Sequence, residues 1–226
     1  MRAVGRWLTM SWLVAVAAAL CAAPVGAQQL AGPAAAQQLA GAAAWADSAR
    51  RAIHAATVRA DLDRLAAARA LVERALVAYP DDPWLLHYLG YALYREAVLR
   101  RERRGEDVGA LFERAEQALE RSAELRPLPE SYALLASILG QRIHANPLQG
   151  ILLGPRSSSL MDRALALGPE NPRVWLLKGI SAIFTPSLFG GGLERAEEAL
   201  RRAIALFEAD GPVPPAPDWG RDEAWA

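Results

Sequence analysis

The side chains able to perform acid–base or metal chemistry are few and scattered along the chain. Its three histidines, His54, His87 and His144, are far apart in the sequence. No His or Cys residues have the close spacing of a metal site, and carboxylates stand beside arginines, as in Glu113-Arg114, which is typical of a solvated helix surface. We therefore predict that the protein is not an enzyme and has no metal site and no cofactor.

Two segments instead offer polar groups for a small anion. Residues 144–156 mix apolar residues with turn formers and run into a serine triplet, and residues 184–192 end in three glycines. A helix that starts after such residues presents free N–H groups and its positive dipole end. No Gly-Lys-Ser/Thr follows the glycines, and a structural role, with Ser157 capping a helix start and the glycines forming a tight turn, is the alternative. The candidate ligand-binding residues are Arg156, Ser157, Ser158, Phe189, Gly190, Gly191 and Gly192.

The first 27 residues have the three parts of an export signal. A basic start precedes an apolar run of 12 residues from Trp12 to Ala23, followed by Val25-Gly26-Ala27, which fits a signal-peptidase site. This run is shorter than the roughly 20 residues that span a bilayer. We predict cleavage before Gln28, an exported protein that is periplasmic or secreted, and no membrane span after cleavage. An uncleaved anchor and a lipoprotein attached through Cys21 are the alternatives.

Composition narrows the possible partners. Cys21 is the only cysteine, so the predicted mature chain has no disulfide and no thiolate. Basic and acidic residues balance at 25 each, which argues against nucleic acid as a partner.

Residues 28–44 contain QQLAG twice and little apolar bulk. We predict a low-complexity tether there, with an extension of the first helix as the alternative.

The chain from residue 45 to 210 repeats one helical pattern. Its apolar residues follow helical spacing, Pro and Gly separate the segments, and no strand-like alternation occurs. A fourth, incomplete copy begins at Ala196 and lacks the final proline, as expected of a terminal repeat. The sequence predicts an all-α domain. The three full copies are Ala68-x3-Val72-x2-Ala75-x4-Pro80, Ala115-x3-Leu119-x2-Ser122-x4-Pro127 and Ser157-x3-Met161-x2-Ala164-x4-Pro169.

This pattern resembles the second helix of the tetratricopeptide repeat (TPR), a helical hairpin of about 34 residues, in the form found in exported bacterial proteins. First-helix features follow two of the prolines: Leu89-Gly90 after Pro80, and Trp175 with Gly179 after Pro169. The resemblance implies a right-handed superhelical solenoid of antiparallel helix hairpins. Three hairpins are clear and the first is degenerate. The small residues Gly90 and Gly179 are expected to let paired helices approach closely.

The resemblance also implies which side chains line the concave face. Aromatic rings there supply rigid contact area and arginines pair with acids, which suits an extended peptide that carries carboxylates. The alternative is that the protein's own tether or C-terminal segment fills the groove. The groove residues are Trp84, His87, Tyr91, Tyr94, Gln141, Arg142 and Arg173.

The C-terminal residues 211–226 combine a proline-rich stretch, expected to be extended, with a short turn. We expect Trp219 and Trp225 to cap the last hairpin, with partner contact as the alternative.

The predicted function is a non-catalytic protein-interaction scaffold in the cell envelope that binds a peptide or partner protein. The alternative function is a transport-associated accessory protein that binds a small solute or anion through loops 144–156 and 184–192.

Overall fold

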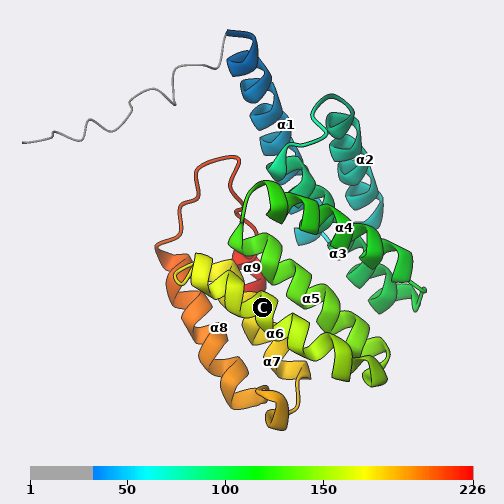
Figure 1. The fold of residues 1–226 in the computed structure, drawn as a ribbon, viewed down its shortest axis with the longest axis vertical. Helices are drawn as coiled ribbons and strands as arrows, with labels where there is room; N and C mark the ends of the chain where they lie inside the picture. The colour runs from blue at the N-terminus through cyan, green and yellow to red at the C-terminus, as the bar shows by residue number, and fades with distance from the viewer. Residues whose placement is uncertain (1–32, 226) are drawn as a thin grey trace, which may run out of the picture.

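The computed structural model describes residues 33–225, in which helices are the only regular secondary structure (Figure 1). The predicted export signal over residues 1–27, with Cys21, and the first part of the predicted tether lie outside the described residues. The elements are α1 (Pro33–Val58), α2 (Leu62–Ala78), α3 (Pro83–Arg104), α4 (Gly109–Leu125), α5 (Pro129–Ala145), the 3-10 turn η1 (Pro147–Gln149), α6 (Gly150–Leu167), α7 (Pro172–Phe184), the 3-10 turn η2 (Ser187–Phe189), α8 (Leu193–Glu208) and α9 (Arg221–Ala224).

Prolines and short polar caps set the starts of several helices. Helices α3, α5 and α7 each begin with a proline, whose fixed φ suits the first helical turn and whose missing N–H is not needed there. The Asp82 carboxylate accepts a hydrogen bond from the Leu85 N–H at 2.9 Å. The Asn171 side chain accepts one from the Arg173 N–H at 3.0 Å. These caps satisfy N–H groups that have no partner inside the helix.

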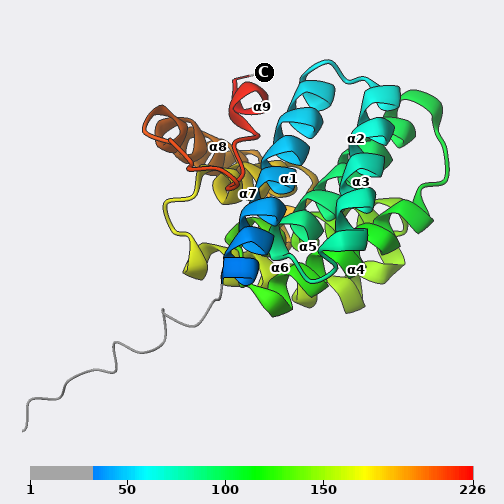
Figure 2. The ribbon, with the colours of Figure 1, turned by 90° about the horizontal axis from the view of Figure 1, so that it is seen from above.

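Successive helices pack in pairs: α1 with α2, α3 with α4, α5 with α6, and α7 with α8. The two helices of each pair run in opposite directions (Figure 1). Contacts also join α1 to α3, α3 to α5, and α5 to α7. These four helices form a row, here called the inner row. Figure 2 shows this row beside the end of the chain.

Glycines bring the helices of two pairs close together, as the sequence predicts. A Cβ added to Gly90 on α3 would lie 2.8 Å from Leu119 Cδ2 on α4. A Cβ on Gly179 of α7 would lie 2.7 Å from Leu200 Cγ on α8. Both leucines fill the space that the missing side chain leaves. The expectation that these positions exist for packing is confirmed.

Two helices start earlier than the sequence suggests. Helix α1 begins at Pro33, so residues 33–44 are helical, in line with the alternative of an extended first helix. Alanine favours helix, and Ala42 is buried, which gives this stretch a packing contact that composition alone does not reveal. Helix α6 begins at Gly150, and Ser157 lies inside it. The expected helix start at Ser157 is therefore wrong, because η1 leads directly into α6 and Pro155 is accommodated within the helix.

The main core lies between the inner row and the helices paired with it. Tyr88, Tyr91 and Leu93 on α3 pack there with Leu134 and Ile138 on α5. Trp219 from the C-terminal segment belongs to the same buried cluster. The end of the chain is thus part of the core rather than an addition to the surface.

Candidate functional site

The C-terminal segment, residues 209–225, turns back from α8 and runs along the inner row (Figures 1 and 2). Tyr88 on α3 donates a hydrogen bond from its hydroxyl to the Pro215 carbonyl at 2.6 Å. The segment ends in the short helix α9, which contacts α8. The inner row is therefore covered by the protein's own chain, which is the alternative that the sequence left open.

The central contact of this segment is an aromatic stack. The Trp219 ring lies on the Tyr91 ring of α3, with centroids 4.7 Å apart and planes 18° apart. Both side chains are buried. Burial raises the pKa of the Tyr91 hydroxyl far above its usual value, since the phenolate would be desolvated. Such a pair combines a large apolar area with a defined geometry.

An acid before Trp219 in the sequence and an acid after it each pair with an arginine of the inner row. The Asp218 carboxylate contacts the Arg50 guanidinium of α1. The Glu223 carboxylate lies 2.7 Å from the Arg95 guanidinium of α3. All four side chains are only partly exposed, so solvent screens these pairs less than ordinary surface pairs.

A third acid anchors the start of the segment. Asp210 pairs with Arg173 of α7 through two hydrogen bonds, at 2.6 and 3.3 Å. The same guanidinium lies 5.6 Å from the centre of the Phe207 ring. Gly220 passes Leu176 with a φ of +97°, and a Cβ there would lie 2.8 Å from Leu176 Cδ2. The backbone conformation and the close approach together require glycine.

Three polar atoms of the segment are buried without a hydrogen-bond partner: Asp218 Oδ1, Trp219 Nε1 and Glu223 Oε1. Glu223 Oε1 lies 2.7 Å from the Arg95 guanidinium in an ion pair, whereas the other two atoms have no such contact. An unpaired buried polar group costs about 1–3 kcal/mol relative to a paired one. The segment therefore fills the inner row through apolar and ionic contacts while part of its polar surface stays unmatched.

Trp219 is not where the sequence places it. We expected it to cap the last hairpin, but its ring stacks on Tyr91 of the second helix pair. Trp225 does approach the last pair, with its ring 6.2 Å from that of Phe207 on α8. The proline-rich stretch is not extended throughout as expected, because Pro214 and Pro215 form a turn in which the Ala216 N–H donates to the Val213 carbonyl at 3.0 Å. Beyond this turn, the buried Tyr91 ring offers Trp219 a flat partner.

His87 lies next to Tyr88 on α3 and belongs to a series of buried, hydrogen-bonded polar side chains. Its Nδ1 atom is 2.9 Å from the Ser131 hydroxyl of α5, which is 3.2 Å from the Ser122 hydroxyl of α4. Its Nε2 atom has no hydrogen-bond partner. Burial, with a smaller effect from the Arg173 charge, lowers the pKa of His87 to about 3. His87 is therefore neutral at pH 7 and serves packing.

This burial predicts a pH dependence of stability. The pKa of His87 is about 3 in the folded protein against 6.5 when free. Its contribution is complete above pH 6.5 and is lost as the pH falls, at about 1.4 kcal/mol per pH unit. Between pH 7.5 and 5, the wild type should lose about 2 kcal/mol more than His87→Asn in urea unfolding. Equal losses for the two proteins would show that His87 is not buried neutral.

The other predicted groove residues are engaged within the fold. The Arg126 guanidinium lies 4.9 Å from the centre of the Trp84 ring. Tyr94 is buried. Gln141 accepts a hydrogen bond from Arg101, and Arg142 donates one to Glu116 at 2.9 Å. Of the seven predicted groove residues, Tyr91 stacks directly on the C-terminal segment and Arg173 pairs with Asp210 where that segment leaves α8.

The predicted serine loop does not form an anion site of the expected kind. Arg156 pairs with Glu116 and Glu120 of α4. Ser157 donates its hydroxyl hydrogen bond to the Ala136 carbonyl at 2.9 Å, and Ser158 is exposed on α6. No helix start brings their N–H groups together.

The glycine run is a closed turn. The Gly190, Gly191 and Gly192 N–H groups donate to the carbonyls of Ser187, Pro186 and Ala182, respectively, at 2.9–3.2 Å. Gly191 packs directly against Thr185, and Phe189 is exposed. In residues 33–225, no hydrogen bond or ion pair joins this turn to residues 156–158. The run therefore has the structural role that the sequence left as an alternative.

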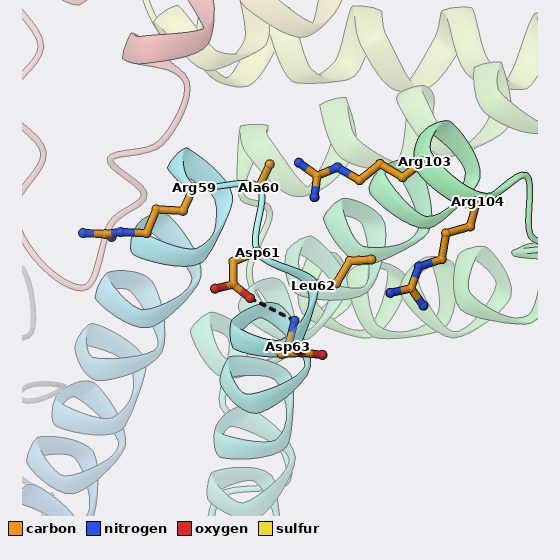
Figure 3. A pocket seen from close by; sticks show the side chains of 7 residues that line it. All are labelled: Arg59, Ala60, Asp61, Leu62, Asp63, Arg103 and Arg104. Atoms are coloured by element: carbon orange, nitrogen blue, oxygen red, sulfur yellow. Dashed lines mark hydrogen bonds between the residues drawn. The ribbon is translucent and has the colours of Figure 1, made fainter.

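A separate depression lies where the α1–α2 turn faces the end of α3 (Figure 3). Its volume is about 510 Å³, and it is open to solvent. Arg103 and Arg104 extend toward the turn, whereas Arg59 points away from it. Asp61 caps α2 by accepting hydrogen bonds from the Asp63 and Arg64 N–H groups. Charges of both signs line this surface, and they do not converge on one point.

Across the described part of the chain, no three His, Cys, Asp or Glu side chains gather as metal ligands. Over residues 33–225, no helix is both long enough and apolar enough to cross a membrane. Comparison of the chain with protein-family models, curated proteins and solved structures gives no match.

Sequence reasoning missed several residues of this site. Arg50 lies in the hairpin with the weakest repeat signature, and Tyr88 stands outside the concave positions of the TPR pattern. Asp218 and Glu223 flank Trp219 in the sequence. The signal that could have found these pairs is the order of residue types: an aromatic residue with an acid on either side in the sequence, in a chain whose helices carry arginines.

Proposed function

We propose that the protein is a non-catalytic interaction scaffold of the cell envelope, built as a right-handed TPR-like solenoid. Its inner row would bind a short peptide that carries an aromatic side chain between two carboxylates. The packing of successive helix pairs, the contacts along the inner row and the repeat pattern support the solenoid. The sequence pattern of residues 1–27, which predicts an export signal, supports the compartment.

The C-terminal segment is the observation that carries the proposal. It meets the inner row as a peptide ligand would, with a buried tryptophan and, before and after it in the sequence, an acid that pairs with an arginine. Its backbone contributes through the hydrogen bond from Tyr88 to Pro215. Buried aromatic and arginine contacts of this kind dominate the energy of peptide recognition.

The unmatched polar atoms argue that this occupant is replaceable. Asp218 Oδ1 and Trp219 Nε1 stay without partners while the segment is docked. A partner that pairs its own polar groups would avoid this penalty. It must still compete with a tethered segment, whose effective concentration is of the order of millimolar. Measured partner affinity would thus be weaker than the intrinsic affinity of the inner row.

The test uses a fluorescently labelled peptide of residues 210–226 and the full chain. Asp218→Ala combined with Glu223→Ala removes both acids from the attached segment. The Arg95 guanidinium and the Arg50 Nη1 atom then lose their contacts with the segment and can meet the peptide, while Arg50 keeps its pair with Asp47. We expect this double variant to bind the peptide at least about tenfold more tightly than the wild type in fluorescence anisotropy, because losing the two partly exposed pairs together should weaken the attachment of the segment by about 1.4 kcal/mol or more. Circular dichroism would verify that its helical content is unchanged.

Two controls make the result specific. Asp222→Ala removes an exposed acid of the same short helix, so this variant should bind the peptide like the wild type. Adding Arg95→Ala to the double variant should weaken binding again by about tenfold. Equal peptide binding by the wild type and the folded double variant, or no binding by either, would contradict the proposal.

A further inference from the structure

A group of large apolar side chains lies exposed at one end of the molecule, away from the C-terminal segment's stack. The exposed fractions of Leu148 and Ile151 are both 84%, and that of Leu188 is 86%. These side chains come from the α5–α6 and α7–α8 connections, at the end of the molecule opposite the start of α1 (Figure 1). The group, here called the edge patch, consists of Leu148, Ile151, Leu152, Phe184, Leu188 and Phe189.

The two connections form one surface. The His144 ring at the end of α5 lies 5.7 Å from the Phe184 ring at the end of α7, in an edge-on arrangement. Each connection is also held in place locally. The Asn146 side chain caps η1 by accepting a hydrogen bond from the Leu148 N–H at 3.2 Å, and Gly191 packs against Thr185 below η2. The apolar side chains therefore project from fixed positions: Leu148, Leu188 and Phe189 from the two 3-10 turns, and Ile151, Leu152 and Phe184 from the adjoining ends of α6 and α7.

The two segments that carry the edge patch contain basic residues and no acidic ones. Residues 131–161 and 171–193 contain no Asp or Glu, and acids resume at Asp162 and Glu194. Arg195 directs a guanidinium nitrogen to within 3.2 Å of the position that a Gly190 Cβ would take. In the described chain Arg195 forms no ion pair. Glu116 and Glu120 on the neighbouring α4 are already paired with Arg156.

We propose that the edge patch inserts into the surface of a lipid bilayer that bears anionic headgroups. Side chains that project from turns and helix ends can enter a fluid apolar layer, whereas a protein partner needs a matching hollow for each of them. Patches of this kind on a protein surface mark interaction sites. The absence of acids avoids repulsion by anionic headgroups, and Arg195 adds attraction.

The experiment is co-sedimentation of the full chain with vesicles. We expect binding to vesicles of phosphatidylcholine mixed with phosphatidylglycerol, and weaker binding to phosphatidylcholine alone. Ile151→Glu and Leu188→Glu should each lower the partition coefficient by about tenfold or more, because a charge cannot enter the apolar layer. Val77→Glu is the matched control, since Val77 on α2 is also 84% exposed, and it should bind like the wild type.

Three outcomes would overturn the proposal. The wild type could remain in the supernatant, or bind neutral and anionic vesicles equally. Ile151→Glu and Leu188→Glu could bind as well as the wild type. The wild type could instead self-associate without binding vesicles, with Ile151→Glu abolishing this in sedimentation velocity, which would assign the patch to a second copy of the chain. The altered side chains are exposed, so each variant should keep its helical circular dichroism.

Discussion

Replacing Trp219 with alanine should lower the free energy of unfolding by about 3–5 kcal/mol, the range for removing a large buried aromatic side chain. The ring is part of the main core cluster and stacks on Tyr91. Loss of the ring would leave a cavity next to Tyr91 of α3 and weaken the attachment of the segment between Asp210 and Glu223 to the helices. Urea unfolding followed by circular dichroism would measure the change.

Trp225→Ala is the control for this prediction. The Trp225 side chain belongs to the same segment but is 53% exposed, so its removal should cost less than about 1 kcal/mol. Trypsin cleavage after Arg221 should also become faster in Trp219→Ala than in Trp225→Ala, because only the first variant releases the segment. Equal stability of Trp219→Ala and the wild type would show that Trp219 is not buried.

Replacing Arg173 with alanine should cost about 3–5 kcal/mol, the range for removing one partner of a buried ion pair. The Arg173 side chain is 3% exposed and pairs with Asp210 at 2.6 Å. It also lies over the Phe207 ring. Thermal and urea unfolding of the variant would give the loss. Because Asp210 begins the C-terminal segment, faster proteolysis of that segment should accompany it.

An exposed ion pair on α8 provides the comparison. Arg201 and Glu197 lie 2.7 Å apart, but their side chains are 76% and 63% exposed. Arg201→Ala should therefore change the free energy of unfolding by less than about 0.5 kcal/mol. Similar losses for Arg173→Ala and Arg201→Ala would contradict the role assigned to the buried pair.

The helical framework could be predicted from the sequence because its signals are local. Helical periodicity, prolines at helix starts and small residues at helix contacts each act within a few residues or within one hairpin. Gly90 and Gly179 were recognised in this way, and their contacts with Leu119 and Leu200 agree with the prediction. The start of α6 differs from the predicted start at Ser157, because the helix begins at Gly150 and continues through Pro155.

The candidate site could be predicted only in part, because its contacts join distant parts of the chain. Tyr88 and Pro215 are separated by 127 positions. The sequence alone does not distinguish an apolar surface on α8 from the Tyr91 ring as the partner of Trp219. The choice depends on where the prolines direct the segment and on the arginines that meet Asp218 and Glu223, which no local pattern specifies.

The central claim is that the C-terminal segment occupies the inner row as a ligand would. Photo-crosslinking tests it most directly: position 219 of the full chain carries p-benzoylphenylalanine, and the linked peptides are identified by mass spectrometry. We predict a crosslink within one molecule to the α3 peptide that contains Tyr91. Crosslinks only to α8, or only to a second molecule, would contradict the account.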